Sequence, residues 1–414
     1  MFVVPEILLH FHTDANGVLP PAFGNGRISP MPRHPNFSPS VLDIAGAVYS
    51  ALAHRLATHK GEVYPLHVGD TWMEPPEGCR MEDLRVAEHP GMHRYAAPQG
   101  LPALLDALVE QTRARSGAPT ERENILVTTG ATGGLGAVAG AILAPGDEVL
   151  LLAPHWPLIT GIVQSFHGVA VEVPFFGRAD SPESAVEVVR EYLTDRSVAL
   201  YFNTPSNPTG RTIPRPWIEA LVEWARREDL WILSDEVYED YIFSGEPHTY
   251  CRPLAPERTF AAHSFSKAYG MAGNRCGHIA GPAGAMKELR KIGVHSFYST
   301  PTASQLAALR VLQGPGEAWV GQARERYRAV GERAAARLGV APPQGSTFLF
   351  LDVADRLDGR GLTGFLEDCV DRGLFAAPGP SFGPYPTHVR ICFTAAPPDV
   401  VERGVEVLAA LLGR

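Results

Sequence analysis

Thr259-Phe-Ala-Ala-His263 is a short apolar run, and Ser264-Phe-Ser-Lys-Ala-Tyr-Gly-Met-Ala-Gly-Asn-Arg-Cys-Gly277 follows it directly. The run is typical of a buried strand, and the segment after it is rich in glycine. A lysine placed among hydroxyls and near a second cation, here Lys267 near Arg275, is a candidate amine nucleophile toward a carbonyl compound. The two serines and the arginine are suited to holding a phosphate dianion. Together they favour an aldehyde that carries a phosphate, such as pyridoxal phosphate, although the motif alone more often marks a surface loop without chemistry.

Between residues 124 and 281, apolar runs alternate with helix-length segments. The runs cover 125–128, 148–152, 169–173, 198–202, 231–234, 259–262 and 278–280. This alternation is typical of a parallel sheet with helices on both faces. We therefore expect an α/β protein whose large domain holds a seven-stranded, mostly parallel sheet. Ligands of such sheets bind at the carboxyl ends of the strands.

The two ends of the chain differ from this central region. Residues 1–39 are rich in Pro, Gly and Asn and predict an extended N-terminal arm. Strand-like runs at 348–352 and 389–393, with helices near 361–372 and 397–412, predict a second, smaller α/β domain. We expect residues 40–63 and 314–414 to form this small domain and residues 64–313 to form the large one.

Composition excludes several classes of protein. The chain has 414 residues, 45% of them hydrophobic, and a formal net charge of −9, so nucleic-acid binding is not favoured. The five cysteines are scattered without a CxxC pair, which suggests neither a disulfide framework nor a zinc site, and we expect no metal. No apolar run reaches the ~18 residues of a membrane span, and the N-terminus lacks a basic region. We expect a cytoplasmic protein.

Polar clusters follow several of the expected strands. Residues 128–134, Thr-Thr-Gly-Ala-Thr-Gly-Gly, open a helix and suit a phosphate, though a plain strand–helix turn reads the same way. Trp156 suits stacking on a flat heterocycle or simple core packing. Asn207, extended before Pro208, has an amide free to donate to a ring oxygen. Asp235, buried at a strand end, needs a partner such as a protonated pyridine nitrogen, or else caps a helix.

These motifs, in this order and spacing, resemble the class I/II aminotransferases, which are fold-type I pyridoxal-phosphate enzymes. The resemblance covers about residues 40–412 and rests on Asn207-Pro-Thr-Gly, Ser234-Asp-Glu-Val-Tyr238, Ser264-Phe-Ser-Lys267 with Arg275, and Arg390. It implies a homodimer that uses pyridoxal 5′-phosphate and acts on an amino acid and a 2-oxo acid.

The resemblance also implies a role for each residue. Lys267 would form the Schiff base with the cofactor and then move the proton. Asp235 would hold the pyridine nitrogen, Asn207 and Tyr238 the ring oxygen, and Trp156 the ring face. The phosphate would be held by Ala131, Thr132, Ser264, Ser266 and Arg275, with Tyr95 reaching in from the second subunit. Arg390 would bind the substrate carboxylate, and Gly69 would offer backbone beside it.

The choice of substrate is less constrained by the sequence. No arginine can be assigned to a distal carboxylate, and Trp72, Trp156, Phe348 and Phe382 favour an apolar or aromatic amino acid. A second hypothesis is a pyridoxal-phosphate lyase or cyclising enzyme of secondary metabolism, because the same ring-holding residues serve several reactions. A regulator on this fold would carry a basic DNA-binding domain at its N-terminus, and residues 1–40 are too short and not basic.

Overall fold

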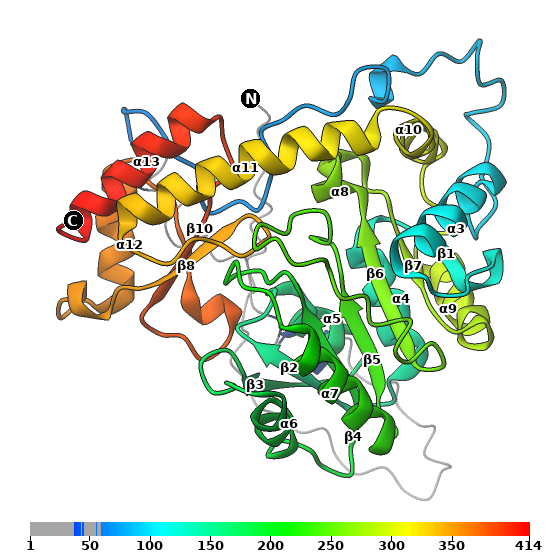
Figure 1. Ribbon diagram of the computed structural model, residues 1–414, viewed down its shortest axis with the longest axis horizontal. Coiled ribbons are helices and arrows are strands. Elements are labelled where there is room, and N and C mark those ends of the chain that lie inside the picture. Colours follow the sequence, from blue (N-terminus) through cyan, green and yellow to red (C-terminus); the bar gives the residue numbers. More distant parts are fainter. Residues whose placement is uncertain (1–36, 43, 45–54, 56–58) are drawn as a thin grey trace, which may run out of the picture. The chain divides into compact units, whose positions relative to one another are not determined.

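The computed structural model describes residues 37–42, 44, 55 and 59–414 (Figure 1). Residues 39–414 form one compact unit, and only this unit is considered below. The predicted arm lies, except for its last residues, outside the described part of the chain. The division of the remainder into a large and a small domain stays a prediction.

All seven expected strands form, and they make one sheet, as predicted. Its spatial order is β1-β7-β6-β5-β4-β2-β3, and only β7 runs antiparallel to its neighbours. The strands are β1 (Ile125–Thr128), β2 (Glu148–Ala153), β3 (Val169–Pro174), β4 (Ser197–Asn203), β5 (Trp231–Asp235), β6 (Thr259–Ser264) and β7 (Gly277–Ala280). Apart from the edge strand β3, which is partly exposed, the strands are largely buried on both faces, which explains why they read as continuous apolar runs rather than alternating ones.

Helices cover both faces of this sheet (Figure 1). On one face α4 (Gly130–Ile142), α5 (Leu158–Ser165) and α9 (Ala283–Ser296) pack against Leu151, Leu233 and Ile279. On the other face the cover consists of α3 (Pro102–Ser116), α6 (Pro182–Arg190), α7 (Arg215–Arg227) and α10 (Thr302–Gln313). The two apolar layers hold the carboxyl ends of the parallel strands at one edge.

A second sheet has the order β8-β10-β9 and is antiparallel. Its strands are β8 (Phe348–Asp352), β9 (Ala377–Pro378) and β10 (His388–Cys392), so both runs predicted here are strands. The helices beside it are α11 (Gly316–Leu338), α12 (Gly361–Asp371) and α13 (Pro398–Leu411), which share its apolar core. Two short helices, α1 (Pro39–Leu42) and α8 (Phe265–Ala268), complete the helices in the described residues.

Local sequence signals set several helix ends. Ser181 caps α6 by accepting a hydrogen bond from the Ser184 backbone N–H at 3.1 Å, and Pro182 occupies the first helical position. Helix α11 ends where Gly339 takes a left-handed conformation, with φ of 62°.

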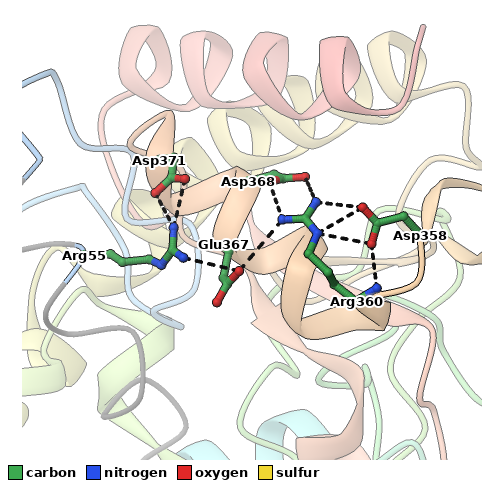
Figure 2. Close-up of polar contacts among 6 residues, drawn as sticks. All are labelled: Arg55, Asp358, Arg360, Glu367, Asp368 and Asp371. Atoms are coloured by element: carbon green, nitrogen blue, oxygen red, sulfur yellow. Dashed lines mark hydrogen bonds and ion pairs between the residues drawn. The ribbon is translucent and has the colours of Figure 1, made fainter.

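Exposed arginines form ion pairs on the surface of α12 (Figure 2). Arg55 donates to Asp371 at 2.9 Å and lies 3.3 Å from Glu367, while Arg360 bridges Asp358 and Asp368 at 2.8 Å each. Such solvent-exposed pairs contribute about 0–1 kcal/mol each. The pairs of Arg55 link that residue to α12, and all of these ion pairs lie outside the site described below.

None of the helices in the described ranges combines the length and the apolar character that crossing a membrane requires.

Candidate active site

A cavity of about 150 Å³ lies at the carboxyl ends of β4, β5 and β6 and at the start of α4. Every residue expected at the cofactor except Tyr95 lines it. The lining residues are Ala131, Thr132, Trp156, Asn203, Asn207, Asp235, Val237, Tyr238, Ser264, Ser266, Lys267, Ala272 and Arg275. Because these residues come from separate strand ends, the sheet itself brings them together.

Lys267 projects from α8, the single turn that follows β6. Its Nζ donates to the Gly69 carbonyl oxygen. Burial lowers the pKa of Lys267, and the nearby Arg390 and Arg275 lower it further, against the opposing effects of Cys392 and Asp70. A lowered pKa raises the fraction of neutral amine, which is the form that attacks an aldehyde or takes a proton.

Asp235 is the last residue of β5 and is 3% exposed. Its Oδ2 accepts a hydrogen bond from the Tyr201 hydroxyl at 2.8 Å. Burial raises the pKa of Asp235 to about 6, and the Tyr201 hydroxyl opposes that rise. In the part of the chain that the structure describes, no cationic side chain forms an ion pair with this carboxylate. A cationic ring nitrogen in the cavity would supply the missing charge, so the residues present fit a pyridinium.

The Tyr201→Phe variant tests this support of Asp235. Loss of the hydroxyl removes a hydrogen bond to the charged form, so the pKa of Asp235 should rise from about 6 by roughly one unit. Asp235 would then be about half protonated at pH 7. We expect pyridoxal phosphate to bind about threefold more weakly at pH 6.5 and nearly normally at pH 8.5. Equilibrium titrations at the two pH values measure this; equal losses at both would contradict the assignment.

Asn207 and Arg390 form a hydrogen-bonded chain beside the ring-holding residues. The Asn203 side chain donates to the Asp235 carbonyl at 2.8 Å and accepts from the Asn207 N–H at 2.7 Å. Arg390 Nη1 donates to Asn207 Oδ1 at 2.8 Å, and Nη2 donates to the His67 carbonyl at 2.5 Å. Asn207 therefore lies between the carboxylate end and the guanidinium end of the site.

Two aromatic rings hold the Arg390 guanidinium. Its Cζ lies 4.4 Å from the centre of the Phe348 ring and 4.8 Å from that of Phe382. A cation positioned above the face of an aromatic ring is attracted to it. The two phenylalanines that the sequence assigned to a substrate side chain thus orient the arginine, and Trp72 packs instead against Tyr327, with ring centres 4.6 Å apart. The sequence argument from Trp72 stays a prediction.

A phosphate fits at the opposite end of the cavity. Ala131 and Thr132 lie in the first turn of α4, where backbone N–H groups are unpaired within the helix. Arg275, left-handed with φ of 51°, has Nη1 2.8 Å from the Ala272 carbonyl and 3.4 Å from the Ser266 hydroxyl. A Cβ at Gly130 would lie 2.6 Å from Arg275 Nη2. Only glycine leaves that guanidinium its place beside the helix start.

Other predicted residues occupy varied positions. Tyr238 is buried against Phe348, and burial raises the pKa of its phenol. Trp156 borders the cavity. Ser264 accepts from the Ser266 N–H at 3.1 Å and caps α8. Tyr95 is 86% exposed beside Tyr298 and is not brought to the cavity within this chain.

Sequence reasoning missed Tyr201, which lies inside the expected fourth strand, and Asn203, which follows that run directly. Neither was given a role in the site. Only the sheet register, which places Asn203 beside Asp235, shows that their side chains support the site. A polar residue at the end of an otherwise apolar run was the available signal.

Comparisons with known proteins agree with this geometry. A family model described as aminotransferase class I and II matches residues 63–408. The aspartate/prephenate aminotransferase of Thermus thermophilus is 32% identical over 380 residues, which are 89% of this chain and 96% of that protein. The arginine–pyruvate transaminase of Pseudomonas aeruginosa is 33% identical over 338 residues, 80% of this chain and 85% of that protein.

Solved structures show the same likeness. Aspartate aminotransferase from Thermus thermophilus with maleate superposes with a TM-score of 0.82 at 30% identity, covering 91% of this chain and all of that one. The aromatic aminotransferase from Pyrococcus horikoshii gives 0.78 at 26% identity, covering 87% and 98%.

The fold and the cavity define a pyridoxal-phosphate enzyme of fold type I. The chain belongs to the class I and II aminotransferase family and is a pyridoxal-phosphate-dependent transferase of amino groups.

Proposed function

We propose that this enzyme moves the amino group of an L-amino acid with an apolar or aromatic side chain to a 2-oxo acid. One observation carries the proposal: a part-buried amine, a buried carboxylate that forms no ion pair among the described residues, and a phosphate cradle line the same cavity. Separate strands deliver these groups, and together they match the aldehyde, the ring nitrogen and the phosphate of one cofactor.

Each group of residues has a distinct task in this proposal. Lys267 would hold the cofactor aldehyde, and its amine would move a proton at the substrate carbon. Asp235, supported by Tyr201, keeps a proton on the ring nitrogen. Asn207 and Tyr238 hold the ring oxygen, and Trp156 covers the ring. Ala131, Thr132, Ser264, Ser266 and Arg275 hold the phosphate, and the Gly69 backbone lies near the substrate carboxylate.

Bound pyridoxal phosphate supplies an electron-withdrawing ring that stabilises negative charge at the substrate carbon. The chain supplies orientation, exclusion of water and the proton. The Lys267 amine and the Asp235 carboxylate line the same cavity, so proton transfer and charge stabilisation act on one bound molecule.

Replacing Arg390 with alanine should weaken amino-acid binding. The planar guanidinium is 7% exposed and already oriented by Asn207 and His67, which suits it to a two-point grip on a carboxylate. Loss of a buried charged contact costs roughly 2–5 kcal/mol, so KM should rise about 30-fold or more, while the affinity for cofactor changes little. Steady-state kinetics and cofactor titration measure both. Arg403 is an exposed arginine, so Arg403→Ala serves as the control. An Arg390→Ala enzyme that binds the cofactor more weakly but keeps the wild-type KM for the amino acid would refute the role.

The preference for an uncharged side chain rests on the cations near the site. Among the described residues that line the cavity, Lys267 and Arg275 are the cations, and the proposal gives each a task. Arg390 is the neighbouring guanidinium, and it is assigned to the α-carboxylate. Trp156, Phe348 and Phe382 supply apolar surface around these groups.

Comparing L-phenylalanine with L-aspartate as amino donor tests the preference. We expect a higher kcat/KM for phenylalanine with a common 2-oxo acid acceptor, and a strong preference for aspartate would defeat the proposal. The same incubation without acceptor separates transfer from a lyase or cyclising reaction. A transferase accumulates the amine form of the cofactor, which absorbs at shorter wavelength, whereas a lyase releases ammonia and regenerates the starting spectrum.

We also propose a homodimer in which Tyr95 reaches the phosphate of the second subunit, since its phenol is exposed and far from its own cavity lining. A cytoplasmic location remains part of the proposal. The mass of the protein in solution tests the dimer. The cofactor affinity of the Tyr95→Phe variant, compared with that of the wild type, tests the shared site.

A further inference from the structure

A second buried polar cluster lies on the opposite face of the large sheet, behind the cavity. Neighbouring residues of a strand point to opposite faces. Ser264 lines the cavity, so His263, its neighbour in β6, points to the other face; Glu236, which follows the end of β5, lines the same pocket as His263. The register pairs His263 of β6 with His278 of β7. The transfer reaction as proposed so far gives this cluster no role.

His263 lies between two carboxylates. Its Nδ1 is 3.0 Å from Glu239 Oε1, and its Nε2 is 3.9 Å from Glu236 Oε2. The ring stacks on His278, with centres 4.6 Å apart and planes 16° apart. Glu236 Oε1 accepts from the Ser234 hydroxyl at 2.8 Å, and its Oε2, in a side chain 1% exposed, has no hydrogen-bond partner among the described residues.

Groups from every surrounding element face this imidazole. They are Arg115 from α3, Glu236, Glu239 and Asp240 after β5, His248, Tyr250 and Arg252 from the segment before β6, Tyr269 after α8, and His278 from β7. Arg115 lies 3.5 Å from Glu239 and 3.0 Å from Asp240.

Contacts with carboxylates assign the proton in this cluster. His263 lies between Glu239 and Glu236, whereas the Nδ1 of His278 has no hydrogen-bond partner among the described residues. Burial lowers the pKa of His278 well below its usual value, and the neighbouring His263 adds to that effect. Burial also works against a charged His263, but Glu239 outweighs it and raises the pKa of His263. The positive charge therefore belongs to His263, and the Arg115 guanidinium beside Glu239 disfavours a metal ion at the same place.

We propose that His263 is a positioning residue for amino transfer: its imidazolium, held by Glu239 on the far face of the sheet, keeps Asp235 anionic for the ring nitrogen. The inference rests on the proposed function, in which Asp235 pairs with that nitrogen. The two strands are joined here, because Asp235 pairs with Ala262 and the Glu236 N–H donates to the Ala262 carbonyl at 3.0 Å. Burial raises the pKa of Asp235 and the charge of Glu236 adds to that rise, whereas the positive charge of His263 lowers it.

Cofactor binding to the apoprotein between pH 5.5 and 8.5 tests the proposal. For the wild type, affinity should fall as pH drops through the Asp235 pKa of about 6. In His263→Gln the fall should begin about one pH unit higher, giving roughly threefold weaker binding at pH 6.5, about eightfold weaker binding at pH 5.5 and a small change at pH 8.5. The cofactor's own ionisation affects both proteins equally, so it cancels in the ratio of their affinities at each pH. A uniform loss at every pH indicates a structural role only and overturns the proposal.

Two further variants sharpen the result. His278→Gln removes the stacked neutral ring and should leave the pH profile in place, whereas His263→Lys retains a positive charge and should move the profile back toward the wild type. The opposite pattern contradicts the charge assignment. If His263→Gln does not fold, nitrogen-15 NMR of the histidines in the wild-type apoprotein decides: a His263 ring that is neutral at pH 7 overturns the proposal.

Elemental analysis and wild-type controls separate the remaining outcomes. A stoichiometric metal ion whose removal by a chelator reproduces the His263→Gln profile would replace the imidazolium account. Failure of the wild type to bind pyridoxal phosphate or to transfer amino groups would sink the proposed function itself. If the wild type does both and the pH dependence of cofactor affinity is unshifted in His263→Gln, only this inference is wrong.

Discussion

Lys267→Ala is expected to abolish turnover and the visible absorbance of the bound cofactor. The amine at this position is the covalent anchor and the acid–base group, so one substitution removes both. Acid–base catalysis alone accounts for about 10²–10⁴-fold in rate, and loss of the anchor adds to it. The protein should still fold, because Lys267 Nζ contacts the Gly69 carbonyl in a cavity rather than filling the core. Absorbance spectra and single-turnover kinetics of the purified variant measure the effect.

Lys291→Ala is the matched control for this prediction. Lys291 is exposed on α9 and pairs only with Glu288 at 2.7 Å in the described part of the chain. Its removal should leave the spectrum and the rate unchanged. A Lys267→Ala protein that kept the wild-type spectrum would show that another amine holds the cofactor.

The second large effect is expected for Asp235→Asn. The amide keeps the shape of the carboxylate but not its charge, so the ring nitrogen loses the partner that keeps it protonated. Removing a preorganised charge of this kind lowers kcat by about 10²–10³-fold. Substrate affinity should change much less, because Arg390 and Asn207 hold the substrate end of the site. Steady-state kinetics separate kcat from KM.

Asp229→Asn provides the comparison, since Asp229 has a side chain 94% exposed and pairs with Arg258 at the surface. This variant should match the wild type within experimental error. Near-normal kcat in Asp235→Asn would mean that the ring proton does not depend on Asp235.

The large sheet was predictable because its strands are buried on both faces. A parallel strand under two helical layers reads as an unbroken apolar run, and the polar residues that end each run mark the edge where ligands bind. Asp235 and Lys267 stood out for that reason. Their meeting in one cavity follows from the strand order, which places β5 next to β6.

The parts that sequence reasoning missed depend on register and on the opposite face. Tyr201 supports Asp235 from a neighbouring strand, 34 residues away in sequence, and no local pattern links the two. Trp72 was assigned to the substrate from its aromatic character; its contact with Tyr327, 255 residues away in sequence, could not be foreseen, and its role at the substrate stays a prediction. The His263 cluster escaped notice because its carboxylates and imidazoles lie on four separate segments.

Borohydride reduction of the cofactor-loaded enzyme, followed by peptide mass spectrometry, tests the central claim most directly. Reduction fixes the cofactor permanently to whichever amine holds it. The account predicts the modification on Lys267 and on no other lysine. A modification at Lys60, Lys287 or Lys291, or none at all, would contradict it.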